Sequence, residues 1–307
     1  MYNEFPYNFI IQGNAMKLFK GKIKNRGIIS LGSSIYNNKT ALIGTIILGV
    51  FVLIAIFGPI IMPFSTLDFG NPEDMLKPPS PEHLLGTDDM GRDILANLVS
   101  GARVSLLIGV LATLISMGIG TIIGISAGYF GKAVDNILMR MTDFFLVIPW
   151  LPLMMVLAAI LGTSIWNIIF VIGITSWAGT ARVVRAQTLS VKERQFVERT
   201  VSLGAGSFHI MLKHILPNVF PLIFANTVLI AATAIISETT LSFLGLGDPT
   251  RASWGMMLHY AFESGAASAD AYWYYLPPGI CVVLVVLSFA LMGYAFDEIM
   301  NPKFKER

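Results

Sequence analysis

The sequence has few charged residues for its length and almost no cysteine. Of 307 residues only 13% are charged, against about 25% in an ordinary soluble domain, and 54% are hydrophobic. A water-soluble globular protein is therefore not expected, and with a formal net charge of +2 neither is an intrinsically disordered chain. Cys281 is the single cysteine, which excludes an internal disulfide framework and a metal site built on several thiolates. The basic residues are too scattered for a nucleic-acid surface.

Long apolar runs are what the chain has in abundance. A bilayer core needs about 20 apolar residues of helix, and six runs meet or approach that length: residues 41–62, 104–129, 143–161, 165–180, 219–237 and 276–296. Isolated strands cannot satisfy their backbone groups in hydrocarbon, and a barrel would show alternating polarity. The first run is too long for a cleavable signal peptide. The sequence predicts an all-α integral membrane protein with six transmembrane helices.

The distribution of basic residues predicts the orientation in the membrane. Seventeen of the 21 Lys and Arg residues fall in the terminal tails and in alternate loops, and four fall on the other side. Because cytoplasmic loops carry the excess of Lys and Arg, both termini are expected on the cytoplasmic side of the membrane. The extracytoplasmic loops are acidic instead.

The chain divides at the ends of these runs. We expect a cytoplasmic tail at 1–40, the first transmembrane helix at 41–62, and an extracytoplasmic loop at 63–103. A core of five transmembrane helices at 104–300 contains a cytoplasmic loop at 181–218, and a short tail follows at 301–307. The extracytoplasmic loop is expected to end in a short amphipathic helix, with Thr87 as its N-cap, that leads into the second span.

The cytoplasmic loop is predicted to form a helix-turn-helix. One helix reaches Leu203, the turn is Gly204-Ala205-Gly206, and a second short helix is ended by Pro217. The basic charge of the loop is explained by membrane orientation alone, and docking of a partner is the competing interpretation. Docking is favoured by apolar residues that would otherwise be exposed, which are Val197, Val201, Leu203, Phe208 and Met211.

Four segments resemble a known family. Glu198, Gly204, Leu216 and Pro217 are spaced as in the EAA motif of permease subunits of bacterial ATP-binding cassette importers. The segments 85–106, 139–149, 236–255 and 296–303 are similar to the second permease subunit of dipeptide, oligopeptide and nickel uptake systems. The sequence departs from the family pattern at four positions, which are Arg199, Thr200, His214 and Asn301.

The resemblance implies a fold, partners and roles. It implies the transmembrane fold of a type I importer in a bacterial inner or plasma membrane. It also implies a homologous second permease, two cytoplasmic ATPases that bind ATP and Mg²⁺, and an extracytoplasmic solute-binding protein. No cofactor is expected in this chain. Glu198 would pair with an ATPase or cap the helix, Gly204 would permit the turn through positive φ, and Pro217 would stop the second helix. The implied coupling residues are Glu198, Arg199, Thr200, Gly204, Ala205, His214, Leu216 and Pro217.

The resemblance favours di- or oligopeptides as the cargo. Nickel chelates and oligosaccharides are alternatives within the same family. An independent secondary transporter is the competitor from another class, and it should show intramembrane charges in several spans or paired broken helices.

Polar residues near or inside the spans have two interpretations each. Asp143 follows Arg140 by one helical turn, which indicates a structural ion pair or a substrate contact. Glu238 is expected either to cap or gate the extracytoplasmic end or to be exposed at the interface. Five further polar residues could either line a translocation pathway or form hydrogen bonds between neighbouring helices. These are Asn167, Thr175, Trp177, Asn226 and Thr227.

The second span carries a ridge of small residues, Gly120, Gly124 and Gly128, which predicts close helix packing within this chain or with a sister permease.

Three enzyme-like patterns lack the context that their chemistry needs. Ser126 has nucleophile-elbow spacing but lies inside an apolar helix instead of a strand-turn-helix. His209 and His214 are five residues apart, so on an α-helix they should point to different faces and not form a zinc pair. The Gly-Lys pairs lack the rest of a phosphate-binding loop. We therefore expect no ATPase activity and no metal site in this chain, and a membrane-bound enzyme is the least favoured class.

Overall fold

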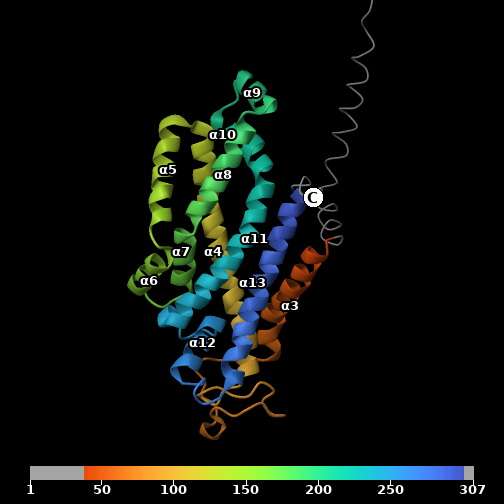
Figure 1. The fold of residues 1–307 in the computed structure, drawn as a ribbon, viewed down its shortest axis with the longest axis vertical. Helices are drawn as coiled ribbons and strands as arrows, with labels where there is room; N and C mark the ends of the chain where they lie inside the picture. The colour runs from red at the N-terminus through yellow and green to blue at the C-terminus, as the bar shows by residue number, and fades with distance from the viewer. Residues whose placement is uncertain (1–37, 301–307) are drawn as a thin grey trace, which may run out of the picture.

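The computed structural model describes residues 38–300, so the predicted tails at 1–40 and 301–307 lie outside it except for residues 38–40. This part of the chain is helical, with an isolated bridge between Thr87 and Asp93 and no β-strand (Figure 1). Helix α9 (Gln195–Ser202) lies at one end of the bundle and helix α12 (Trp254–Glu263) at the other. We call these the α9 end and the α12 end.

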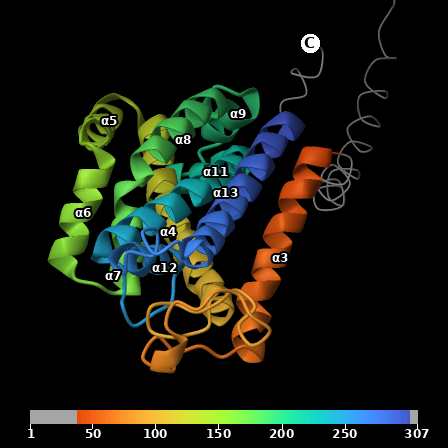
Figure 2. The same cartoon turned by 60° about the horizontal axis from the view of Figure 1, so that its bottom comes forward.

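Helix α3 (Lys39–Ile61) is the first span, close to its predicted limits. The side chain of Asn38 caps it by accepting hydrogen bonds from the backbone N–H groups of Thr40 and Ala41. Its apolar residues surround the whole helix, which is typical of a segment in lipid. The helix packs against α4 and α13 and lies on the side of the bundle away from α5 and α6 (Figure 2).

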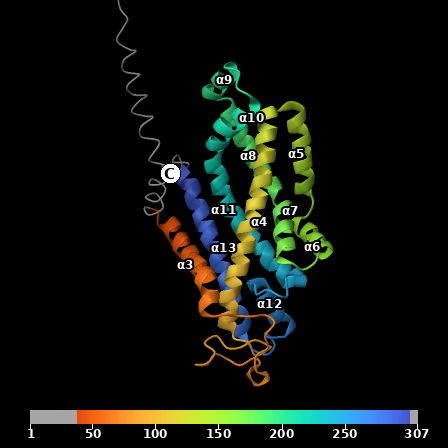
Figure 3. The ribbon, with the colours of Figure 1, turned by 180° about the vertical axis from the view of Figure 1, so that it is seen from behind.

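Helix α4 (Ile94–Phe130) is the longest uninterrupted α-helix in residues 38–300, and it contacts α3, α7, α8 and α11 (Figure 3). The prediction of a separate amphipathic helix before the second span was wrong, because the two form one continuous helix of 37 residues. Thr87 is not its N-cap either. Asp93 holds that position with an extended backbone and accepts a hydrogen bond from the N–H of Ala96 at 2.9 Å.

The glycine ridge of α4 packs inside this chain. A Cβ added at Gly120, Gly124 or Gly128 would lie 2.6–2.7 Å from atoms of α8 (Trp177–Lys192). The small residues therefore allow the backbones of α4 and α8 to approach closely. Of the two alternatives that the sequence left open for this ridge, the structure shows packing within this chain.

The predicted third and fourth spans are each two helices joined at a bend. Helix α5 (Lys132–Val147) and helix α6 (Trp150–Leu161) meet at 88°, and helix α7 (Ile165–Thr175) and α8 meet at 41°. The prediction of one helix over 143–161 was wrong because Pro149 keeps Ile148 extended, at ψ 129°. The predicted fourth span, 165–180, is broken at Ser176.

In the segment predicted as a helix-turn-helix, the helices begin and end at other residues than predicted. Helix α8 runs to Lys192, and a short turn precedes α9. After the Gly204 turn, α10 (Ser207–Ile210), the π-helical η2 (Met211–Ile215) and α11 (Leu216–Leu241) continue as one helix. The prediction that Pro217 ends the second helix was wrong. The wider π-turn of η2 ends at Ile215, just before Pro217, and accommodates the hydrogen bond that proline cannot donate.

The chain ends in two elements at the α12 end and one long return helix. The π-helical η3 (Ser242–Leu246) kinks at Gly245, φ 81°, and leads to α12. Helix α13 (Tyr272–Met300) then runs back along α3 and α11. A short 3-10 turn, η1 (Pro72–Asp74), lies in the loop between α3 and α4. Four helices of the described chain are long and apolar enough to cross a membrane, or up to six if each bent pair counts as one span.

Candidate functional site

The α9 segment presents the predicted coupling residues at the surface. Glu198 and Arg199 are exposed, and the hydroxyl of Thr200 donates to the carbonyl of Phe196 at 2.7 Å. Gly204 has a φ of 79° with open space around it, so its role in the turn is conformational. The N–H of Ala205 donates to the carbonyl of Thr200 at 3.3 Å and closes the turn.

Large apolar side chains project from this segment. Leu203 is 87% exposed, Phe208 71% and Val201 52%. Met211 is half-buried, and the prediction that Val197 would be exposed was wrong, because it is 1% exposed and packs with Val191 and other residues below the loop. One side of α9 is therefore anchored in the bundle while the other presents an uncovered apolar surface.

A groove of about 610 Å³ lies beside α9, against the end of α4 and of α8. We call it the α9 groove. Its residues include the carboxylates of Glu193 and Glu198, neither of which pairs with a cation in the described chain, around an apolar floor. Lys192 also lines it, but its ammonium group donates to the carbonyl of Tyr129 at 2.6 Å. The groove has the charge and polarity that would receive a basic, partly apolar side chain.

The π-turn changes the relation between the two histidines. The rings of His209 and His214 lie with their centroids 5.6 Å apart, so the prediction that they point to different faces was wrong. A π-helix has more residues per turn than an α-helix, so residues five apart share a face. In the same segment Leu216 is half-buried and Pro217 is exposed, and Asn218 donates to the carbonyl of His214 at 2.7 Å. No group of three metal-ligating side chains occurs in residues 38–300.

A cavity of about 610 Å³ lies where both bent helix pairs break, and we call it the hinge cavity. The α5–α6 bend contributes Ile148 and Pro149, the α7–α8 bend contributes Ser176, and α11 closes the third side. Its wall is mainly apolar with a few hydroxyl groups. Those hydroxyls belong to Thr175, Ser176, Thr233 and Ser237.

Of the polar residues predicted for a pathway, Thr175 lines the hinge cavity. The other four are engaged elsewhere. Asn167 donates to the carbonyls of Leu161 and Gly162, at the turn between α6 and α7. Trp177 is buried against Phe145.

The two predicted pathway residues of α11 bond within the bundle. Asn226 donates to the hydroxyl of Thr180 on α8 at 3.5 Å. The hydroxyl of Thr227 contacts the carbonyl of Ile223 and the sulfur of Met117. For these residues the structure has the helix-bonding arrangement that was the alternative interpretation.

The ion pair predicted for α5 has a different partner. Asp143 accepts from Arg182 of α8 at 2.5 Å, and Arg140 donates to Asn136 at 3.1 Å, so the pairing of Arg140 with Asp143 was wrong. A second pair, Asp135 with Arg185, joins the same two helices. Both pairs hold α5 against α8. Their partners are 39 and 50 residues apart in the sequence, so local spacing could not predict them.

Glu238 is completely buried at the α12 end, so its exposure at an interface is wrong. Its two carboxylate oxygens accept from the hydroxyls of Ser105 at 3.3 Å and Ser242 at 2.9 Å. Ser105 in turn accepts from the N–H of Trp254 at 3.2 Å. This Glu238 network joins α4, α11, η3 and α12 around a single carboxyl group.

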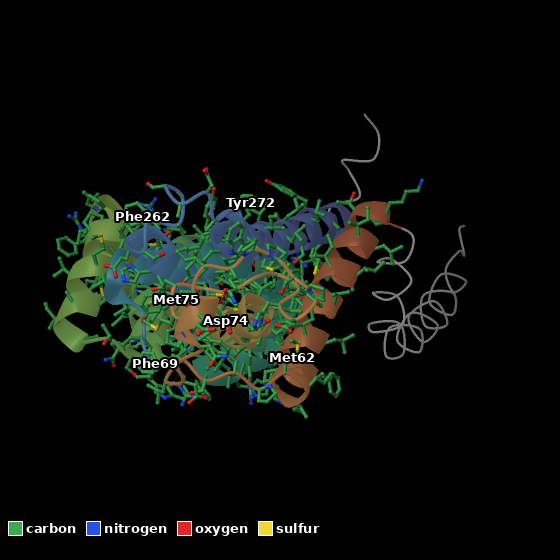
Figure 4. The ribbon with its side chains drawn as sticks, turned by 90° about the horizontal axis from the view of Figure 1, so that it is seen from below. Met62, Phe69, Asp74, Met75, Phe262 and Tyr272 are labelled. Carbon is green, nitrogen blue, oxygen red and sulfur yellow. The ribbon has the colours of Figure 1, made fainter. Side chains whose placement is uncertain are left out.

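The loop before α4 is held by buried polar groups. Asp88 is fully buried, and it accepts from the guanidinium of Arg92 at 2.7 Å. Burial raises the pKa of Asp88, and the opposing effect of Arg92 does not cancel it. Thr87, also buried, accepts from the N–H of Lys77 at 2.9 Å, and Tyr274 donates to Asp89 at 2.8 Å. Figure 4 shows this loop from below, with Asp74 and Met75 lying across the end of the bundle.

The sequence did not single out the hinge cavity or the partners of Glu238. Thr233 and Ser237 are four residues apart and therefore share one face of α11, which was a usable signal. Ser105 and Trp254 lie in segments 85–106 and 236–255, whose family pattern was recognised, but no spacing rule joins residues 149 positions apart.

Two family models match this sequence. One, described as binding-protein-dependent transport system inner membrane component, matches residues 120–306. The other, described as the N-terminal TM domain of oligopeptide transport permease C, matches residues 34–79. Together they take in the hinge cavity, the α9 segment and helix α3.

Named relatives are similar over most of the chain. Dipeptide transport system permease protein DppC of Alkalihalophilus pseudofirmus is 38% identical over 269 residues, which cover 87% of each chain. Oligopeptide transport system permease protein OppC of Bacillus subtilis is 36% identical over 274 residues, 88% of each chain. OppC of Lactococcus lactis subsp. cremoris is 34% identical over 277 residues, 89% of this chain and 94% of the relative.

Proposed function

The chain belongs to the family of binding-protein-dependent transport system inner membrane components, and from that premise we propose that it is a permease subunit of an ATP-driven importer of di- or oligopeptides. Members of this family are multi-pass bacterial membrane proteins that are not themselves enzymes. The names of the relatives support peptides over nickel chelates or oligosaccharides.

The hinge cavity is the part of the chain that would form one wall of the translocation pathway. It lies where two bent helix pairs and α11 meet, and it is large enough for a small ligand. An apolar wall with a few hydroxyl groups suits peptides of varied side chains, because it makes no strict demand on charge. Glu238, one residue beyond Ser237 on α11, would hold the α12 end in register with this wall.

The observation that carries the proposal is that the same two helices connect the cavity to the α9 segment. Helix α8 begins at the cavity with Ala178 and Gly179 and ends just before α9. Helix α11 follows the α9 segment and reaches the cavity at Thr233. A movement imposed on α9 would therefore be transmitted to the cavity through two helices, as alternating access requires.

The partners follow from this arrangement. Of two cytoplasmic ATPases that bind ATP and Mg²⁺, one would dock on the exposed face of α9, with Glu198 and the α9 groove receiving a basic side chain, and the other would dock on the second permease. A homologous second permease would complete the pathway, and an extracytoplasmic binding protein would deliver cargo to the acidic loop before α4. The α9 end would then be cytoplasmic, together with both termini, and six spans result if each bent pair is one span.

An independent secondary transporter is the second candidate, because the structure contains the paired bent helices that this class should show. The exposed apolar face of α9 has no use in that model, and the family membership disfavours it.

Uptake by the purified chain and its co-purifying partners in vesicles tests the proposal. Uptake of a labelled tripeptide should require ATP on the α9 side and should not follow an imposed ion gradient. Gly179→Leu would place a side chain in the hinge cavity without a clash at Cβ, because a Cβ there meets nothing within 4 Å. We expect uptake to fall at least tenfold. Gly118→Leu is the matched control, since Gly118 also faces open space but lies on α4, away from the cavity.

Two results would contradict the proposal. Gradient-driven uptake by the chain alone would favour the secondary transporter. Equal loss of uptake in both variants would show that the cavity has no special role. For the coupling step, Gly204→Val should leave the chain in the membrane but abolish recovery of ATPases in a mild-detergent pull-down.

A further inference from the structure

A third cavity, of about 690 Å³, lies at the α12 end between the start of α7, the first turns of α4 and the loop that precedes α12. We call it the arginine cavity. It shares no lining residue with the hinge cavity. Its charged residues are Arg103 of α4, and Arg251 and Asp248 of the loop.

Hydrogen bonds hold the walls of this cavity in place. Arg92 donates to the carbonyl of Thr66 at 3.0 Å, and the hydroxyl of Thr66 donates to the carbonyl of Thr250 at 2.7 Å. Asp248 accepts from the N–H groups of Thr250 at 3.0 Å and of Ile165 at 3.3 Å. The loop before α4, the loop before α12 and the start of α7 are thus tied together around one space.

The two guanidinium groups in the cavity have no partner. Neither Arg103 nor Arg251 donates a side-chain hydrogen bond or joins an ion pair anywhere in residues 38–300, and both are exposed. Asp248 is already occupied by the backbone donors. With two arginines and one aspartate, the charged groups of the cavity sum to one positive charge.

The cavity lies at the boundary of the membrane-crossing part of α4. Leu107 and Leu114 follow Arg103 on the same side of the helix and are 43% and 51% exposed. Trp166, 68% exposed, lies at the start of α7 and also lines the cavity. A basic group above an exposed apolar stripe, with a tryptophan beside it, is the pattern of a side chain at the headgroup level of a bilayer. Phosphate groups of the lipids lie at this depth and carry the charge opposite to that of an arginine.

We propose that Arg103 and Arg251 bind the phosphate of a phospholipid headgroup, whose acyl chain lies along Leu107 and Leu114. The single negative charge of a phosphodiester matches the net charge of the cavity. The planar fork of arginine donors suits phosphate oxygens. The site needs the chain to be in a bilayer but does not depend on which cargo it carries. A lipid held there would fix the loop before α12 against α4.

Native mass spectrometry of the full-length chain, stripped of lipid in mild detergent, tests this site. Dioleoylphosphatidylglycerol should bind with one copy retained at the highest collision energy. In Arg103→Gln with Arg251→Gln, its affinity should fall at least tenfold. The matched control, Arg140→Gln with Arg194→Gln, removes the same charge elsewhere and should bind normally. Arg103→Lys with Arg251→Lys should keep part of the affinity, and thermal melting of each variant shows that it is folded.

Four outcomes would overturn the proposal. The double glutamine variant could bind the lipid as well as the unchanged chain does. Dioleoylglycerol, which has no phosphate, could bind equally and show that apolar contact alone is responsible. Millimolar inorganic phosphate could displace the lipid completely, which would make the cavity a site for free anions. Finally, the double glutamine variant could keep the lipid but lose a co-purifying second permease, which would assign the cavity to a protein contact.

Discussion

The two ends of the bundle are built in opposite ways. At the α12 end, Asp88 and Glu238 are fully buried, and Asp88 is hydrogen-bonded to Arg92 of its own loop while Glu238 is hydrogen-bonded to Ser105 of α4. At the α9 end, Leu203 and Phe208 are 87% and 71% exposed, and Glu198 has no ion-pair partner in the described chain. The buried carboxylates of the α12 end are satisfied by groups of this chain, whereas the α9 end presents exposed apolar side chains beside a carboxylate without an ion-pair partner in residues 38–300.

This difference separates residues that stabilise the chain from residues that contact partners. Buried polar groups are costly when a partner is removed, so substitutions at the α12 end should be read first as losses of folded protein. Exposed apolar groups contribute little to the fold of the isolated chain, so substitutions at the α9 end should be read as losses of assembly. Stability and assembly measured on the same variants can therefore test the comparison.

The largest effect is expected at the Asp88–Arg92 pair. Arg92→Leu leaves the buried carboxylate of Asp88 without its cation, and breaking a buried pair costs about 3–5 kcal/mol. Arg182→Leu is the matched control, because its pair with Asp143 is more than half exposed and is worth about 0–1 kcal/mol. Denaturant titration in mild detergent gives the free energies of unfolding of the two variants. Equal losses would contradict the difference between the buried pair and the exposed pair.

The same variant should show a defect that depends on pH. Burial already raises the pKa of Asp88, and removing Arg92 raises it further. A carboxyl group whose pKa is raised on folding contributes stability below its unfolded pKa, about 3.9, and loses that contribution as the pH rises through the folded pKa. The deficit of Arg92→Leu should therefore be smaller at pH 4.5 than at pH 7.5, and a deficit that is independent of pH would show that Asp88 is not its cause.

Two glycines with the same backbone conformation give the next largest difference. Gly91 and Gly204 have φ values of 73° and 79°, but a Cβ on Gly91 would lie 2.3 Å from the carbonyl oxygen of Asn71, while one on Gly204 meets nothing. Alanine at either position costs about 1–2 kcal/mol for the left-handed backbone. At Gly91 overpacking adds roughly 1–2 kcal/mol more. The α12 end should thus lose more stability, and an equal loss would mean that Asn71 moves away freely.

Much of the fold was predictable from hydropathy. The six apolar runs mark α3, α4, the bent pairs, α11 and α13, because each must present apolar groups to lipid for most of its length. The breaks within the third and fourth spans were missed because Pro149 and Ser176 lie inside runs of uniform hydropathy. Hydropathy indicates which residues face lipid but not the direction of the helix axis. It therefore cannot reveal a bend between two apolar helices.

The sites were predictable where the chemistry is local. Gly204 was recognised from a motif and its positive φ from the turn, and both depend on neighbouring residues only. The partners of Asp143 and Glu238 were not predicted, because Arg182 and Ser105 come from other helices. The approach of His209 to His214 was missed because a π-turn was not foreseen. The coupling role of the α9 segment is still a prediction.

A smaller effect is expected at Glu238. Glu238→Leu removes the acceptor for two buried hydroxyls and should cost about 1–3 kcal/mol, the penalty of leaving buried donors unsatisfied. Glu238→Gln keeps a carbonyl oxygen for one of them and should cost less. The free energy of unfolding checks the order of the two variants. If glutamine were as damaging as leucine, a single carbonyl acceptor would be insufficient, and both oxygens of Glu238 would be needed to hold the network together.

The smallest effect on stability is expected from Leu203→Gln combined with Phe208→Gln. Both side chains are exposed, so the free energy of unfolding of the isolated chain should change by no more than about 0.5 kcal/mol. Recovery of ATPases in a mild-detergent pull-down should nevertheless be lost, because the variant removes the apolar face of the α9 segment. Leu67→Gln with Phe69→Gln is the matched control at the α12 end, where these side chains are 72% and 82% exposed. If the control also loses the ATPases, exposed apolar area in general and not its place on α9 accounts for the binding, and the functional division between the two ends fails.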